Sequence, residues 1–169
     1  MAEKLIAKMR VKKIEMANPL EEYADIATAT WEELPLTLRD DELRIFEEEP
    51  EEDELYSHEN DAPEDTDVVG TGLRATGTFI KVSRSEMATL MGGDTEGTGD
   101  NVKFVLGATK LVLKKALRFT MQDDSVVVAP HASGHVNMDL NLGKGGRAAF
   151  PFNFRLLKAS ADWDAVIVM

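Results

Sequence analysis

Two histidines four residues apart, His131 and His135 in "HASGH", are the first residues in the chain that could do chemistry. On one face of a helix this spacing would let both rings bind a single metal ion. The surrounding sequence is instead typical of a strand and a Ser-Gly turn, so the two rings lie on opposite sides of the turn and need not converge. We therefore favour ordinary turn or surface histidines over a metal site.

Ser133, His135 and Asp139 have the residue types of a nucleophilic triad. Their order and spacing match no strand–turn–helix segment of the kind that exposes a catalytic serine. The chain has no cysteine, which removes a thiolate nucleophile and a thiolate metal site. We predict that the protein is not an enzyme and has no catalytic residue, metal or cofactor. A hydrolase would need His131 or His135 to meet a carboxylate and a nucleophile in a cleft.

The segment "NLGKGGRAAF" has a superficial likeness to a phosphate-binding loop. It lacks the upstream glycine at the right spacing, and Lys144 is followed by glycine where the motif has serine or threonine. It also joins two predicted strands, whereas a phosphate-binding loop opens a helix that holds the anion. We interpret residues 143–146 as a hairpin turn.

The acidic residues are concentrated in one segment. Residues 40–67 contain 15 of the 31 acidic residues and only Arg44 of the 19 basic ones, so the segment has a net charge of −14 and the rest of the chain +2. The run lacks the Asp-x-Asp-x-Asp-Gly pattern of a calcium loop. A near-neutral body with one negative segment also argues against tight nucleic-acid binding, which needs a basic stripe.

Alternation of apolar and polar residues predicts β-strands in the C-terminal half. It appears in residues 111–122, 135–142 and 148–156, and turn residues at 122–125, 132–134 and 143–146 predict antiparallel neighbours. Lys115 breaks the first row, and Pro151 predicts an edge strand or a bulge because it cannot donate to a ladder. The apolar rows are Leu111, Leu113, Leu117, Phe119 and Met121; Val136, Met138, Leu140 and Leu142; and Ala148, Phe150, Phe152, Phe154 and Leu156.

The N-terminal half contains weaker signals. Ser83 and Glu86 have the spacing of a capping box, and Gly92 and Gly93 predict the end of a helix of about two turns. Strands are predicted on both sides of this helix, at 71–82 and 101–107, the second after a loop. Residues 8–16 alternate but change parity near Lys12 and Lys13, which predicts a bulge. Short strands are expected within 30–38 and 42–46, and a loop or brief helix at 17–30.

These elements predict one domain, residues 1–169, that is mainly β: a sandwich or barrel of antiparallel strands with one short flanking α-helix and an acidic loop or arm at about 46–67. Trp31 and Trp163 are expected to be packing residues. The N-terminus is too charged for a signal peptide and no segment is long enough to span a membrane, so we expect a soluble protein with no membrane partner.

The order of these elements resembles that of the major tail tube proteins of tailed bacteriophages. The similar features are Trp31 after a variable loop, the helix "SRSEMATLMGG", the segment "VVAPHASG", and the ending "AAFPFNFRLLKA" followed by a segment with Trp163. The resemblance implies a structural virion protein of a phage or prophage, made in the bacterial cytoplasm and located in the tail. Six copies would form a ring, and rings would stack into a tube.

The same resemblance implies what the protein contacts. Its partners would be copies of itself and other tail proteins, and DNA would pass through the tube without specific binding. A long loop between early strands would contact a neighbouring subunit, and its acidic composition leads us to expect that residues 47–67 are largely mobile in an isolated protomer. The candidate contact residues are Phe46, Glu47, Glu48, Glu49, Glu51, Glu52, Asp53, Glu54 and Tyr56.

Two alternatives remain open at this point. One is a monomeric β-barrel binding module with a small apolar ligand inside, which would need a cavity lined by the phenylalanine and methionine rows. The other is a related tail component, such as a terminator or connector protein, because such proteins share similar folds.

Overall fold

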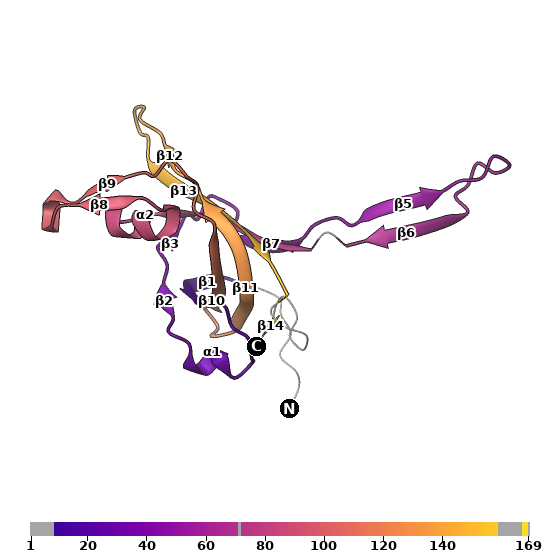
Figure 1. Ribbon diagram of the computed structural model, residues 1–169, viewed down its shortest axis with the longest axis horizontal. Coiled ribbons are helices and arrows are strands. Elements are labelled where there is room, and N and C mark those ends of the chain that lie inside the picture. Colours follow the sequence, from indigo (N-terminus) through magenta and orange to yellow (C-terminus); the bar gives the residue numbers. More distant parts are fainter. Residues whose placement is uncertain (1–8, 71, 159–166, 169) are drawn as a thin grey trace.

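The computed structural model describes residues 9–70, 72–158 and 167–168. They form a mainly β structure, one curled antiparallel sheet in the shape of a half-barrel with a short helix packed against it (Figure 1). The predicted fold class is thus confirmed. Trp163 lies outside the described residues. No helix in the described ranges is long and apolar enough to cross a membrane.

The sheet runs from short N-terminal strands at one end to the strands beside the acidic segment at the other. Its order is β2 (Glu32–Glu33), β1 (Val11–Ala17), β10 (Leu113–Met121), β11 (Val126–Val136), β13 (Ala148–Leu156) and β7 (Leu73–Ile80), with β3 (Leu36–Thr37) and β4 (Arg44–Glu47) both on the outer side of β7. β12 (Asp139–Leu140) pairs with β13, and β14 (Ile167–Val168) pairs with β11.

The remaining elements lie outside this sheet. They are the helices α1 (Asp25–Thr28) and α2 (Arg84–Met91), a 3₁₀ turn at Gly99–Asn101, and two separate hairpins, β5 (Glu51–Leu55) with β6 (Asp65–Val69) and β8 (Asp94–Glu96) with β9 (Lys103–Val105). The short strands expected at 30–38 and 42–46 are therefore present as β2, β3 and β4, and the brief helix within 17–30 is α1.

The alternation predicted in β13 is observed from Phe150 to Leu156, whereas Ala148, predicted to belong to the same inward row, is exposed. Phe150, Phe152, Phe154 and Leu156 are at most 5% exposed, whereas the residues between them are at least partly exposed. Phe152 stacks on Phe79 of β7 with ring centroids 4.4 Å apart. Each such side chain contributes about 1.5–3 kcal/mol when it leaves water, so this row and its neighbours in β10 form the main core on one face of the sheet.

The break in the β10 row at Lys115 is explained by a bulge. The pairing of β10 with β11 shifts register between Lys115 and Leu117, where β11 has the extra residue and also contains Pro130. A bulge is one of the few interior positions where a proline costs no ladder bond. On the other face of the sheet Ala116 joins a small second core, packed against the segment that ends in Trp31.

The start of β1 and the ends of α2 follow the sequence. The pairing of β1 with β10 shifts between Val11 and Lys13, which confirms the bulge predicted there. The Ser83 side chain accepts from the Glu86 N–H while the Glu86 side chain accepts from the Ser83 N–H, so the capping box is complete. Gly92 ends the helix with φ of 76°, a conformation that a side chain disfavours.

The turn predicted at residues 132–134 is wrong. β11 runs without interruption from Val126 to Val136, and Gly134 is one of its residues. A glycine is needed at this position because a Cβ would be 2.1 Å from the Asn153 carbonyl oxygen of the neighbouring strand. After Val136 the chain leaves the sheet and forms the projecting β12–β13 hairpin. Leu140 and Leu142, predicted to face inward, are consequently 48% and 90% exposed.

The expectation that Pro151 marks an edge strand or a bulge is also wrong, because β13 lies between β11 and β7. Its tolerance there has a local cause. The ladder between β11 and β13 ends at Val136 and Phe152, and the next bond runs from the Asn137 N–H to the Pro151 carbonyl. Pro151 therefore lies where β11 departs, so its missing N–H breaks no strand pair.

The loop expected between α2 and the following strand is a second projecting hairpin. Asp94–Glu96 pairs with Lys103–Val105 in its own two-stranded sheet, so the strand expected at 101–107 is shorter and belongs outside the main sheet. Phe104 still packs against the main core, which fixes the base of the hairpin to the body.

Candidate assembly surfaces

The curled sheet has partly unpaired strands at both ends. At one end β2 pairs only with Glu15 and Met16 of β1, and the Leu34 N–H donates to the Ile14 carbonyl at 2.8 Å. Among the described residues, no strand pairs with the outer side of Val11–Lys13. At the other end of the sheet, β7 is the only described strand that pairs with β4. Unpaired N–H and C=O groups on an edge are a template for another strand.

The direction of the free groups on β4 can be deduced from its ladder. The Glu48 N–H donates to the Gly72 carbonyl at 3.0 Å, next to the paired residues Glu47 and Leu73. Because the N–H groups of successive strand residues point to opposite sides, those of Ile45 and Glu47 point away from β7. This edge therefore presents backbone donors to a neighbour.

The face of the sheet opposite the main core is polar where β7, β13 and β11 lie together. An open depression of about 400 Å³ is lined by Thr76 and Thr78, His135 and Asn137, Asn153, and the loop residues Asp41 and Glu42, among others. The Thr78 hydroxyl donates to Asp41 at 2.6 Å, which ties the loop before β4 to the sheet. This face carries hydroxyl, amide and imidazole groups, and next to them the basic side chains of Arg74, Arg155 and Lys114, which lie in one row across β7, β13, β11 and β10.

The acidic segment is a long hairpin that projects from the body (Figure 1), and we call residues 48–70 the acidic arm. All ten residues of its two strands are exposed. Its five residue pairs place Asp53 directly opposite Asp67, and like charges at such positions destabilise a hairpin. The acidic loop or arm expected at about 46–67 is thus a hairpin.

The root of the acidic arm is anchored to the sheet. Arg74 of β7 forms an ion pair with Glu48, and its other guanidinium nitrogen donates to the Asn153 side chain at 3.2 Å. In β4, just before this ion pair, the Arg44 guanidinium lies 4.1 Å from the centre of the Phe46 ring. The arm thus leaves the body from a fixed point, and the position of its base is set by charge pairing.

The tip of the acidic arm has its own hydrogen bonds. Glu64 accepts from Asn60 and Ser57, each at 2.7 Å, and these bonds lower the pKa of its carboxyl. The Tyr56 hydroxyl donates to Glu54, and this bond, with smaller effects of burial and of the glutamate charge, raises the pKa of Tyr56. These bonds are all internal to the arm.

The candidate contact residues occupy three places. Phe46 and Glu47 belong to β4, Glu48 and Glu49 follow at the root, and Glu51, Glu52, Asp53, Glu54 and Tyr56 lie on or just beyond β5. Glu48 already has an intrachain partner in Arg74. Sequence reasoning missed the apolar members of the arm, Leu55, Val68 and Val69, which with Tyr56 are each more than half exposed. The short apolar ends of β5 and β6 were their only signal.

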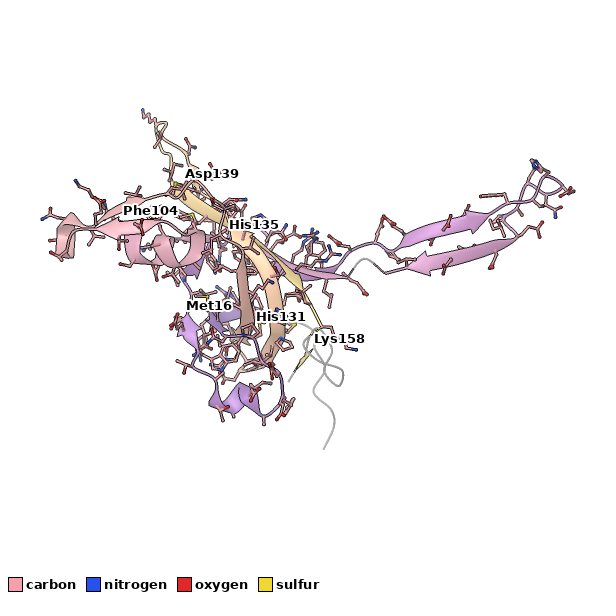
Figure 2. The ribbon with its side chains drawn as sticks, in the orientation of Figure 1. Met16, Phe104, His131, His135, Asp139 and Lys158 are labelled. Carbon is pink, nitrogen blue, oxygen red and sulfur yellow. The ribbon has the colours of Figure 1, made fainter. Side chains whose placement is uncertain are left out.

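The residues considered for chemistry are spread along the sheet. His131 and His135 both belong to β11, so the prediction that a turn separates them is wrong. Figure 2 shows His131, His135 and Asp139 spaced along β11 and β12. Within the described ranges, no group of three His, Cys, Asp or Glu side chains could hold a metal ion.

The predicted turn at residues 143–146 is confirmed. It joins β12 to β13, with the Gly146 N–H donating to the Gly143 carbonyl at 2.9 Å. A Cβ on Gly146 would be 1.9 Å from the Asn141 carbonyl oxygen, which explains the glycine by close backbone approach. The segment leads into a strand, where no helix start is available for an anion.

No protein-family model matches the chain, and no curated protein matches it.

Proposed function

We propose that this protein is the subunit of a phage tail tube, which assembles into six-membered rings that stack into a conduit for DNA. The observation that carries the proposal is the half-barrel whose edges at Val11–Lys13 and at Arg44–Glu47 have no further partner among the described strands. Neighbouring copies would join such edges into one continuous sheet, which removes the exposed backbone groups and closes a barrel that one copy only begins.

The polar face of β7, β13 and β11 supports the conduit. Its side chains include Thr76, His135 and Asn153, and its Arg74 is paired with Glu48. Retention of DNA depends on basic groups that displace counterions from phosphates. The same face also has Arg155 of β13 and Lys114 of β10, so a conduit wall here would be polar and wetted, with a small number of basic groups among neutral ones.

The ligand-binding alternative has less support. Phe79, Phe150, Phe152 and Phe154 are at most 4% exposed, and Phe152 contacts both Phe79 and Phe154, at ring-centroid distances of 4.4 and 5.9 Å. These rings fill the space between them in the way a close-packed core does. A module that holds an apolar ligand would need that space for the ligand.

Negative-stain electron microscopy of the concentrated full chain tests the proposal. We expect rings and tubes with six-fold symmetry in end views. Isolated rings that never stack would favour a terminator or connector protein over a tube subunit. A chain that sediments as a monomer at every concentration would contradict the proposal.

A variant of β4 tests the edge directly. Glu47→Pro removes a backbone N–H that points away from β7 and places a ring in the path of a neighbouring strand, while the bond from Glu48 to Gly72 stays. We expect the concentration needed for assembly to rise about tenfold or more, because a donor is lost at each subunit junction. Glu47→Ala is the matched control, since it removes the same side chain and keeps the N–H. Equal assembly of the two variants would exclude β4 as a junction.

A further inference from the structure

The acidic arm has apolar groups that its own molecule leaves in water. Leu55, Tyr56, Val68 and Val69 are each more than half exposed and lie close to the acidic residues of β5 and β6. β5 and β6 pair only with each other among the described strands. Leu55 and Tyr56 lie at the tip end of the hairpin and Val68 and Val69 at its root end, each among carboxylates, so the arm offers apolar groups to a partner along its length.

A second exposed apolar set lies on the other side of the body. It comprises Val105, Leu106, Val112, Leu140 and Leu142, each nearly half exposed or more, in and around the β8–β9 and β12–β13 hairpins. Lys110 joins this region to the sheet through a bond from its ammonium group to the Val136 carbonyl at 2.5 Å, and Phe104 and Met138 pack on the same core. We call the residues 103–112 and 138–147 the hairpin end.

The hairpin end also has positive charge without local partners. Lys144 and Arg147 are exposed at the turn between β12 and β13, and no ion pair to another described residue is recorded for either. Leu142, 90% exposed, lies two residues before Lys144. The combination of apolar and basic groups complements the apolar and acidic groups of the arm.

The two surfaces lie on opposite sides of the body along its longest axis. In Figure 1 the arm projects to the right, the β8–β9 hairpin projects to the left, and the β12–β13 hairpin rises on the left of the body. One copy therefore cannot bring its own arm to its own hairpin end. A contact between different surfaces of two copies is heterologous, and repetition of it gives a ring or an extended stack.

We propose that the acidic arm of one copy docks on the hairpin end of the next copy, with Lys144 and Arg147 facing the arm carboxylates and Leu142 meeting its apolar residues. This inference rests on the proposed self-assembly and names the receiving surface. It assigns a role to an exposed leucine, a lysine and an arginine for which the fold of one copy has no use.

Charge reversal on the full chain tests the contact. Lys144→Glu with Arg147→Glu should raise the concentration needed for tubes about tenfold or more, measured by sedimentation and electron microscopy, because both residues would then repel the arm. Lys81→Glu with Arg84→Glu is the matched control, since these exposed residues undergo the same charge change outside the hairpin end. Circular dichroism of dilute samples establishes that each variant is folded.

Compensation gives the decisive result. Glu51→Lys with Glu52→Lys on the arm should also impair tubes, and its combination with the Lys144 and Arg147 reversals should restore them. Tubes from the wild type together with normal assembly of the Lys144 and Arg147 variant would overturn this inference and leave the proposed function intact. Absence of any wild-type assembly would overturn both. Leu142→Ser should weaken assembly without a change in charge.

Discussion

At the scale of single residues, Glu15 holds the second core of the sheet in place. Glu15 is 6% exposed, and its carboxylate accepts from Arg118 at 2.8 Å and from Lys13 at 3.0 Å. The Arg118 guanidinium also lies 4.4 Å from the Trp31 ring centre. Glu15→Gln should lower the free energy of unfolding by about 1–3 kcal/mol in urea titrations, because two cations lose their common partner. Glu33→Gln on the adjacent exposed strand should change the free energy of unfolding little. Equal effects of the two variants would contradict the role given to Glu15.

The acid response of Glu15 follows from the same contacts. Burial raises the pKa of its carboxyl, but the hydrogen bonds and charges of Arg118 and Lys13 outweigh burial and hold that pKa below the ordinary 4.5. The resulting stability is present above the unfolded pKa and is lost as pH falls through the lower folded pKa. The difference in unfolding free energy between wild type and Glu15→Gln should be constant near pH 7 and shrink below about pH 4.5. A difference that grows in acid would give the shift the opposite sign.

Gly134 is a second residue with a sharp expectation. A Cβ at this position would be 2.1 Å from the Asn153 carbonyl oxygen and 2.6 Å from the Phe154 Cα, both in the neighbouring strand. Gly134→Ala should therefore separate β11 from β13 and lower the melting temperature by about 10 °C or more, given that 1 kcal/mol is worth about 2–4 °C for a domain of this size. Gly70→Ala is the control, with no atom within 4 Å of the added carbon. Normal melting of Gly134→Ala would mean that the strands are farther apart.

At the scale of elements, the acidic arm should open independently of the body. Its strands are exposed throughout, and Asp53 faces Asp67 across the hairpin. Local opening of such an element costs little compared with global unfolding. A protease specific for glutamate should cut the dilute protein first within residues 49–64, as mass spectrometry would show. Protection of these sites in assembled protein is the second expectation; earlier cleavage at the exposed Glu33 would contradict the order of opening.

The strands were predictable where one face meets the core. The alternation of Phe150, Phe152 and Phe154 is a property of the local sequence and survives in β13. The turn predicted at residues 132–134 is wrong because a glycine required by a close neighbouring strand, such as Gly134, looks the same in sequence as a glycine required by a turn. The inward position predicted for Leu142 is wrong because the alternating row of residues continues past the point where the sheet ends, and only tertiary structure sets that point.

The candidate assembly residues were predictable to a smaller degree. The charge of the acidic arm and its position between early strands both follow from the order of residues in the sequence. The pairing of Glu48 with Arg74 depends on the register of β4 against β7, which no local pattern specifies. This ion pair decides which variants test the arm. Charge reversal at Glu48 would disturb the root of the arm, whereas charge reversal at Glu51 and Glu52 leaves the root intact.

At the scale of the whole molecule, the acidic arm and the body have separable tasks. Residues 49–71, the part of the chain between Glu48 and Gly72, contain ten acidic residues and no basic one, so their removal changes the net charge of the chain from −12 to −2. Glu48 and Gly72 are joined by a backbone bond of 3.0 Å across the root, which allows a two-residue Asn-Gly turn to replace the arm without moving β4 or β7. The main core includes no residue of the arm.

The armless chain should therefore melt within about 3 °C of the full chain, because it loses little buried apolar area. It should still join through the edges of β1 and β4, giving single rings or short oligomers by electron microscopy, but it should not form long tubes, since the acidic arm is absent. Addition of about 0.5 M salt should shorten wild-type tubes by screening the contact of the arm with Lys144 and Arg147, and should leave the armless oligomers largely unchanged. Long tubes from the armless chain would show that edge pairing alone builds the assembly.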